Sequence, residues 1–151
     1  MSFSVHQIKD SVEEFRAMLA LFAEGFEDAE TYLSNPPSTA YILARLADEG
    51  FFALTAKEGE ETVGALAAYE LQKFEQERSE IYIYDLAVNS SHRRKGVATA
   101  LITRLQQIAR TRGAYVIFVQ ADHGDDPAIA LYESLGLREE VLHFDIDPGG
   151  K

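Results

Sequence analysis

One stretch in the middle of the chain constrains the fold more than any other. Residues 80–88, "EIYIYDLAV", are rich in aromatic and β-branched side chains and predict a strand. Four residues later, "RRKG" (93–96) forms a cationic turn that ends at Gly96, and residues 97–112 have the apolar spacing of a helix that Gly113 closes. A helix N-terminus leaves backbone N–H groups unpaired, and glycine lets a ligand approach the backbone closely. This strand–turn–helix unit predicts an anion site. A surface turn with solvated cations explains the turn alone equally well.

The rest of the chain predicts further strands and helices around this unit, with no internal repeat or linker between them. We expect a single domain over residues 1–151. A first helix should begin at Asp10 as N-cap, with Glu13 three positions later, and a loop containing "GFEDAETY" should follow it. The other expected helices are 38–49 and the short one within "GDDPAIALYESLGL", and the other expected strands are 3–8, 51–58, 62–71, 114–122 and 140–147.

Charge and composition exclude several classes of protein. The net charge is −11 and the pI about 4.7, so the chain should repel nucleic acid and anionic membranes unless it carries a separate basic patch. The chain has no cysteine, which excludes disulfides, a thiol nucleophile and Cys-ligated zinc. It also shows no long apolar run and no secretory pattern at its start, so we expect a cytoplasmic protein. The histidines are not spaced as metal ligands, and we expect no metal.

The anion turn matches neither of the common nucleotide motifs. It lacks both the G-x-x-x-x-G-K-[ST] run and the G-x-G-x-x-G run. Its spacing is Arg93-x-x-Gly96-x-Ala98, after "DLAV" and about 30 residues before "ALYESLGL". This combination resembles the GCN5-related N-acetyltransferase superfamily. The resemblance implies an α/β (α+β) fold: a central mixed, mostly antiparallel sheet of six or seven strands, splayed between the fourth and fifth and flanked by about four helices.

The same resemblance implies acetyl-CoA as cofactor and assigns residues to it. The pyrophosphate would lie on the turn, the pantetheine arm would lie along the splayed strand, and Tyr132 would protonate the leaving thiolate. The implied cofactor contacts are Leu86, Ala87, Val88, Arg93, Arg94, Lys95, Gly96, Val97, Ala98, Thr99, Asp125, Ala128 and Tyr132.

A narrower resemblance covers most of the chain from about residue 15. The stretches "FEQERSEIYIYDLAV", "GAYVIFVQADHGDDPAIALY" and "REEVLHFDIDP" are similar to the aminoglycoside 3-N-acetyltransferases of type I. This implies transfer of an acetyl group to the 3-amino group of 2-deoxystreptamine, antibiotic resistance, and a homodimer. Two positions differ from the wider superfamily. Asp125 stands where many members have asparagine, and Leu137 where phenylalanine is common.

The residues themselves support acetyl transfer to an amine. An aliphatic amine is mostly ammonium at pH 7, so a carboxylate must accept its proton before the amine can attack. Asp85 is the natural candidate, because a carboxylate inside an otherwise apolar strand is costly without a partner or a task. Strand alternation places Asp85 on a face with Ile81, Ile83 and Ala87. An aspartate that only bonds a neighbouring turn is the structural alternative, and for Tyr132 the alternative is a core aromatic.

A polycationic substrate requires several acceptors around one cleft. The candidates, each of which alone could be a solvated surface residue, are Asp28, Glu75, Tyr84, Asp85, Gln120, Asp122, Glu140 and Asp145. Two other functions stay open. A polyamine acetyltransferase would use the same machinery in a smaller acidic cleft, and a non-catalytic acyl-CoA sensor would need neither Asp85 nor Tyr132.

Overall fold

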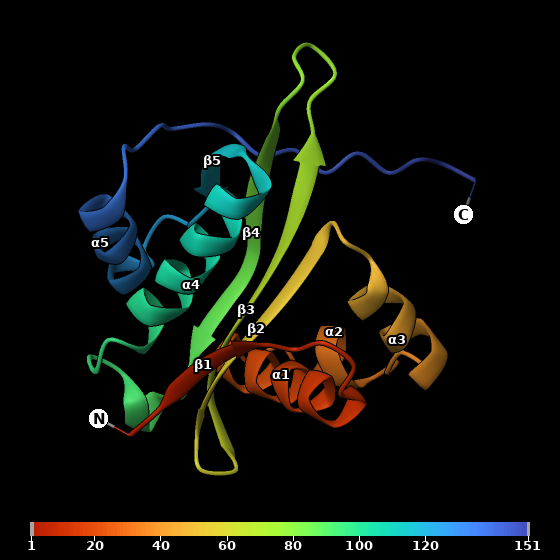
Figure 1. Cartoon of the computed structure of the whole chain (residues 1–151), viewed down its shortest axis with the longest axis vertical. Coiled ribbons are helices and arrows are strands. Elements are labelled where there is room, and N and C mark those ends of the chain that lie inside the picture. Colours follow the sequence, from red (N-terminus) through yellow and green to blue (C-terminus); the bar gives the residue numbers. More distant parts are fainter. Residues whose placement is uncertain (1, 151) are drawn as a thin grey trace. The chain divides into compact units, whose positions relative to one another are not determined.

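A computed structural model describes residues 2–150, and the chain divides after Gln120 into two compact units. The first unit contains one five-stranded sheet in the order β1-β2-β3-β4-β5 (Figure 1). Its strands are β1 (Ser4–Gln7), β2 (Phe51–Glu58), β3 (Glu61–Gln72), β4 (Ser79–Val88) and β5 (Ala114–Val119). Its helices are α1 (Val12–Gly25), α2 (Ala29–Leu33), α3 (Thr39–Ala47), the 3-10 helix η1 (Ser90–His92) and α4 (Val97–Arg112).

The sheet is mostly antiparallel and opens between its last two strands. Strands β1 to β4 pair antiparallel, whereas β4 and β5 pair parallel. The parallel ladder joins Ser79–Ile83 to β5 and then stops, while β4 continues to Val88. The second half of β4 therefore pairs with β3 on one side only, among the described residues. The expected splay between the fourth and fifth strands is confirmed.

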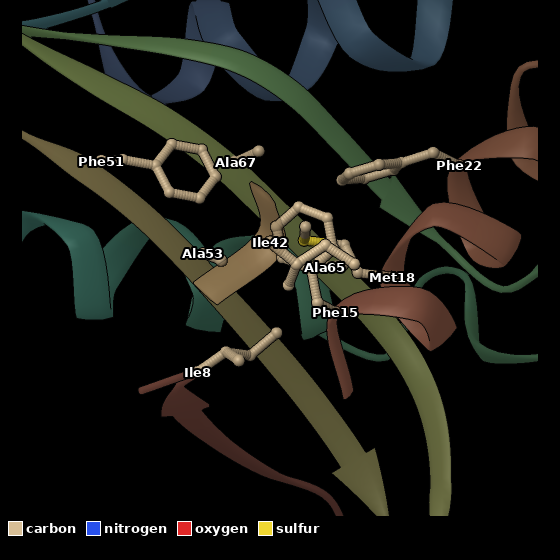
Figure 2. Packing of buried hydrophobic residues seen from close by; sticks show 9 residues of the cluster. All are labelled: Ile8, Phe15, Met18, Phe22, Ile42, Phe51, Ala53, Ala65 and Ala67. Carbon is tan, nitrogen blue, oxygen red and sulfur yellow. The ribbon is translucent and has the colours of Figure 1, made fainter. Parts of the chain in front are cut away.

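Helices cover both faces of this sheet. A cluster of buried apolar side chains joins α1 and α3 to one face, and it includes Phe15, Met18, Ile42, Ala65 and Ala67 (Figure 2). Burial of such side chains supplies most of the folding free energy. Helix α4 covers the opposite face through Val97, Leu101 and Leu105. The approach is close, because a Cβ on Gly64 would lie 2.6 Å from Val97 Cγ1.

Several local expectations are wrong, each for a physical reason. Ser11, not Asp10, caps α1, because its hydroxyl accepts the N–H of Glu14 at 3.1 Å. The expected loop over "GFEDAETY" contains helix α2, which Asp28 caps. The described sheet has five strands rather than six or seven, since residues 140–147 form no strand. A strand requires a partner, and the described residues of the second unit, 121–150, form no strand that could supply one.

The second unit contains helix α5 (Asp126–Leu135), and an extended segment follows it. Asp125 caps the helix and Pro127 lies in its first turn, as the sequence predicts. None of the described helices has the length and apolar character that crossing a membrane requires. The expectation of one domain stays a prediction.

Candidate active site

A bulge in β4 decides which way Asp85 faces. Asp85 pairs with Ala67 and Ile83 pairs with Ala68, so Tyr84 is an extra residue without a partner on β3. The extra residue reverses the alternation of faces along β4. The predicted face with Ile81 and Ile83 is therefore wrong. Asp85 shares the face of Ala87 instead, the face on which the α1 cluster packs.

Asp85 accepts a hydrogen bond from a residue that sequence reasoning missed. The hydroxyl of Tyr32 on α2 donates to Asp85 Oδ2 at 2.8 Å. Burial raises the pKa of the half-buried Asp85 carboxyl above its ordinary value, and the bond from Tyr32 partly opposes this. Burial and the Asp85 carboxylate raise the pKa of Tyr32, so Tyr32 remains a protonated donor. The result is an oriented carboxylate whose pKa is shifted toward neutral pH, as general bases require.

Aromatic rings and a second carboxylate surround this pair. Asp28 is close enough to raise the pKa of Tyr32 through its charge. The ring of Tyr84 is 60% exposed and packs edge-on against Tyr69 and Tyr82, with centroids 5.8 and 5.7 Å away. Electron-rich ring faces and carboxylates both attract ammonium groups. This part of the molecule is therefore suited to a cationic ligand.

Two other predicted substrate residues are placed differently. Gln120 accepts a hydrogen bond from Tyr82 at 2.9 Å, so it joins the aromatic group. Glu75 lies in the loop before β4 and pairs with Lys73 at 3.3 Å. A strand rises about 3.3 Å per residue, so the start of β4 is roughly 20 Å from Asp85. The structure does not bring Glu75 to this site.

The predicted anion site has the backbone geometry that binding requires. The cationic turn, Arg93–Gly96, is exposed, and both Arg94 (φ 61°) and Gly96 (φ 81°) have left-handed backbones. Helix α4 begins at Val97 without a side-chain cap, and its first backbone bond runs from Ala100 N to Gly96 O at 2.9 Å. The N–H groups of Val97, Ala98 and Thr99 precede that bond and are directed out of the helix end.

An acetyl-CoA molecule would fit these features. A Cβ on Gly96 would meet no atom within 4 Å, so space is open beside the turn. Leu86, Ala87 and Val88 lie beyond the last residue of β4 that pairs with β5. Along this half of β4, the backbone groups that face away from β3 would bond an extended arm, and the N–H groups of the helix end would bond phosphates.

The remaining predicted residues belong to the second unit. Asp125 caps α5, and Ala128 and Tyr132 are half-buried residues of that helix. Asp122 is exposed, Glu140 pairs with Arg138 at 3.6 Å, and Asp145 bonds His143 at 2.8 Å. Their roles stay predictions.

Comparison with a model of a known protein family identifies the family of this chain. A model of the family described as "Acetyltransferase (GNAT) family" matches residues 14–137, which include β4, the cationic turn and α5. The chain belongs to this acetyltransferase family. The α/β fold with a splayed mixed sheet, expected from the sequence, agrees with that membership.

Solved structures similar to this acetyltransferase include two from uncultured soil metagenomic samples. The aminoglycoside acetyltransferase HMB0005 is 58% identical with a TM-score of 0.96, and the match covers 99% of this chain and 100% of that chain. The aminoglycoside acetyltransferase meta-AAC0020, solved in complex with sisomicin, is 28% identical with a TM-score of 0.90, covering 98% and 97%.

Curated relatives are more distant and longer. N-acetyltransferase 8B of Rattus norvegicus is 29% identical over 99 residues, which are 66% of this chain and 45% of that protein. N-acetyltransferase 8 of Homo sapiens is 29% identical over 140 residues, which are 84% and 62%. The chain thus spans about half the length of these relatives.

Proposed function

We propose that this acetyltransferase transfers the acetyl group of acetyl-CoA to the 3-amino group of the 2-deoxystreptamine ring of aminoglycosides. The observation that carries the aminoglycoside substrate is the 58% identity to the aminoglycoside acetyltransferase HMB0005 over 99% of the chain. The 3-amino position rests on the resemblance of the sequence to the type I enzymes. The acidic and aromatic surroundings of Asp85 also support a polycationic substrate. In a cytoplasmic protein this activity would give antibiotic resistance.

The proposed mechanism is direct transfer in a ternary complex. Acetyl-CoA supplies the thioester. Asp85 accepts the proton of the substrate ammonium group, directly or through a water, and leaves a neutral amine. The amine nitrogen would bond the acetyl carbon and the carbon–sulfur bond would break. The nitrogen would lose its second proton to solvent, and the sulfur would take a proton that we assign to Tyr132, which solvent then reprotonates. Backbone amides near Leu86 to Val88 would polarise the thioester carbonyl.

A thiol-release assay with acetyl-CoA tests the substrate class. We expect gentamicin and sisomicin to be acetylated much faster than kanamycin, spermidine or a lysine peptide, and NMR of the product to place the acetyl group on the 3-amino nitrogen. Turnover of spermidine equal to that of gentamicin would favour a polyamine acetyltransferase. Acetyl-CoA binding without turnover of any amine would favour a sensor.

The proposed homodimer has support of its own in the second unit. The extended segment 140–147 exposes Val141, Leu142, Phe144 and Ile146, each at 69% or more. Apolar side chains in a strand-like segment without a partner are typical of an interface. A second copy of the chain would cover them. Light scattering after size-exclusion chromatography should give the mass of a dimer, and Leu142→Glu with Phe144→Glu should give that of a monomer.

A further inference from the structure

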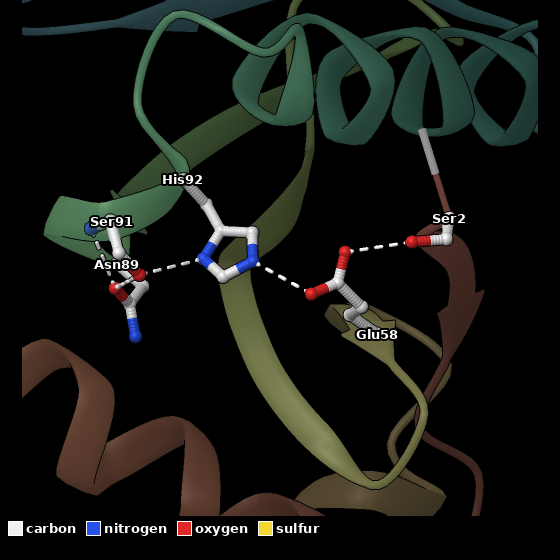
Figure 3. Close-up of polar contacts among 5 residues, drawn as sticks. All are labelled: Ser2, Glu58, Asn89, Ser91 and His92. Carbon is white, nitrogen blue, oxygen red and sulfur yellow. Dashed lines mark hydrogen bonds and ion pairs between the residues drawn. The ribbon is translucent and has the colours of Figure 1, made fainter.

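A buried histidine directly precedes the cationic turn. His92 is the last residue of η1 and is only 7% exposed, whereas Arg93 to Gly96 are all exposed. Sequence reasoning gave His92 no role. Figure 3 shows its ring between Ser91 and Asn89 on one side and Glu58 on the other. Glu58 is the last residue of β2 and is 34 positions away in the sequence.

Two contacts hold this ring. Asn89 Oδ1 accepts the backbone N–H of Ser91 at 2.8 Å and the Ser91 hydroxyl at 2.7 Å. Nδ1 of His92 lies 2.9 Å from Ser91 Oγ. Nε2 lies 3.1 Å from Glu58 Oε1, and because an ionised carboxylate can only accept, Nε2 donates this bond. The ring thus contacts a residue of η1 on one side and a residue of β2 on the other.

Several charged groups lie around the ring. Hydrogen bonds from His92 and from Ser2 lower the pKa of the Glu58 carboxyl, so Glu58 is ionised at neutral pH. One ligand atom each of Glu58, Glu61 and His92 lie within 4.8 Å of one another, which adds the Glu61 carboxylate from β3. Lys95 on the turn is also close enough to act on Glu58 through its charge. Two carboxylates and one lysine thus lie near the contact between His92 and Glu58.

This arrangement anchors one end of a turn that has an unfavourable backbone. A side-chain-bearing residue such as Arg94 rarely adopts a positive φ, and surrounding structure must hold it there. Val97, 1% exposed and packed over Gly64, holds the exit of the turn. His92 holds the entry, because its bond to Glu58 joins η1 to the end of β2.

We propose that His92, braced by Glu58, is a positioning residue for the cationic turn and thereby for acetyl-CoA. The inference rests on the proposed cofactor site. The hydrogen-bonded pair of His92 and Glu58 touches neither the cofactor nor the amine. The pair sets the direction in which the turn presents its backbone N–H groups. Loss of the bond between His92 and Glu58 should therefore weaken acetyl-CoA binding and leave the chemistry at Asp85 unchanged.

The test compares Glu58→Gln and His92→Ala with the parent by calorimetric titration of acetyl-CoA and by steady-state kinetics. The Kd and the KM for acetyl-CoA should each rise about tenfold, which corresponds to the free energy lost with one charge-assisted hydrogen bond. The KM for gentamicin and kcat should stay within about twofold of the parent values, since neither substitution changes a group that contacts the amine or the thioester. His92→Gln keeps a donor toward Glu58 and should recover part of the affinity. Glu58 is partly exposed, so Glu58→Gln should fold even if His92→Ala does not.

Two controls make the outcome decisive. The double variant Glu58→Gln/His92→Gln should bind no more weakly than the worse single variant, because both changes break one link. Ser2→Ala removes the other partner of Glu58 and should leave the Kd within about twofold of the parent. Nitrogen NMR of the parent should show a protonated Nε2 at His92, and an Nε2 without a proton would contradict the bond to Glu58. A parent that fails to bind acetyl-CoA refutes the proposed cofactor site. A parent that binds it, with Glu58→Gln binding equally well, refutes the role of His92.

Discussion

The middle of β4 and the end of β2 each present a carboxylate that accepts a hydrogen bond from a distant side chain. Asp85 is bonded by Tyr32 and Glu58 by His92, across 53 and 34 residues. Their pKa values nevertheless move in opposite directions. Burial raises the pKa of Asp85, whereas the bonds from His92 and Ser2 lower that of Glu58.

The difference shows that the surroundings of a carboxylate set its pKa and thereby the role for which it is suited. A carboxylate in apolar surroundings resists ionisation and can accept a proton near neutral pH, which suits a base. A partly exposed carboxylate that accepts hydrogen bonds stays ionised over a wider pH range, which suits a residue that holds a neighbouring segment in place. Substitutions at the two places should therefore change different kinetic constants.

The largest expected effect is that of Asp85→Asn. This change keeps the size of the side chain and removes its basicity, so kcat should fall at least about a hundredfold near neutral pH. Part of the rate should return at higher pH, where more of the amine is neutral. The Kd for acetyl-CoA should hardly change. Measuring kcat against pH checks this, and a kcat within about threefold of the parent, roughly 0.6 kcal/mol, would remove Asp85 as the base.

The thermal stability of Asp85→Asn separates a catalytic from a structural aspartate. A folded-state pKa above the unfolded value means that the stability this carboxyl contributes is present at low pH and is lost as pH rises through the folded pKa. At pH 7 the ionised group opposes folding, so Asp85→Asn should melt at the same temperature as the parent or higher. A clearly lower melting temperature with normal kcat would support the structural alternative.

The next effect should come from Gly96→Ala in the cationic turn. A Cβ at a positive φ is strained by roughly 1–2 kcal/mol and would lie where the pyrophosphate approaches. We expect the KM for acetyl-CoA to rise at least about tenfold, roughly 1.4 kcal/mol, with little change for the amine. Gly113→Ala is the matched control, because Gly113 has φ 76° and equally open space at the other end of α4. It should lose stability alone, and equal KM values in both variants would reduce the turn to a surface feature.

Tyr32→Phe should have an intermediate effect with a distinctive pH dependence. The lost bond had opposed the effect of burial, so the pKa of Asp85 should rise further. The acidic limb of the pH profile of kcat/KM should then move to higher pH. At pH 7, kcat/KM should fall about fivefold, and it should return to the parent value under alkaline conditions. A uniform loss at every pH would mean that Tyr32 only supports packing.

The smallest effect should be that of Glu75→Gln. Glu75 lies at the far end of β4, and a backbone hydrogen bond, together with Lys73, lowers its pKa. The KM for gentamicin should stay within about twofold of the parent, because exposed ion pairs contribute little. A clearly larger rise would place Glu75 in the substrate site after all.

The sequence alone determined the elements whose interactions are local. The hairpin of β2 and β3, helix α4 with Gly113 at its end, and the turn between β4 and α4 all lie where the sequence predicts them. Helix caps, turns and side-chain periodicity depend on residues only a few positions apart, so a single sequence displays them. The same local signals led to Asp85 and Gly96 as candidate residues.

Tertiary structure decided what these residues face and what holds them. The bulge at Tyr84 turns Asp85 to the α1 face, and the partners Tyr32 and Glu58 come from distant elements. Residues 140–147 show that an apolar pattern makes no strand without a neighbour to bond. Strand register and long-range side-chain hydrogen bonds depend on which segments meet in space, and neither periodicity nor spacing encodes that along the chain.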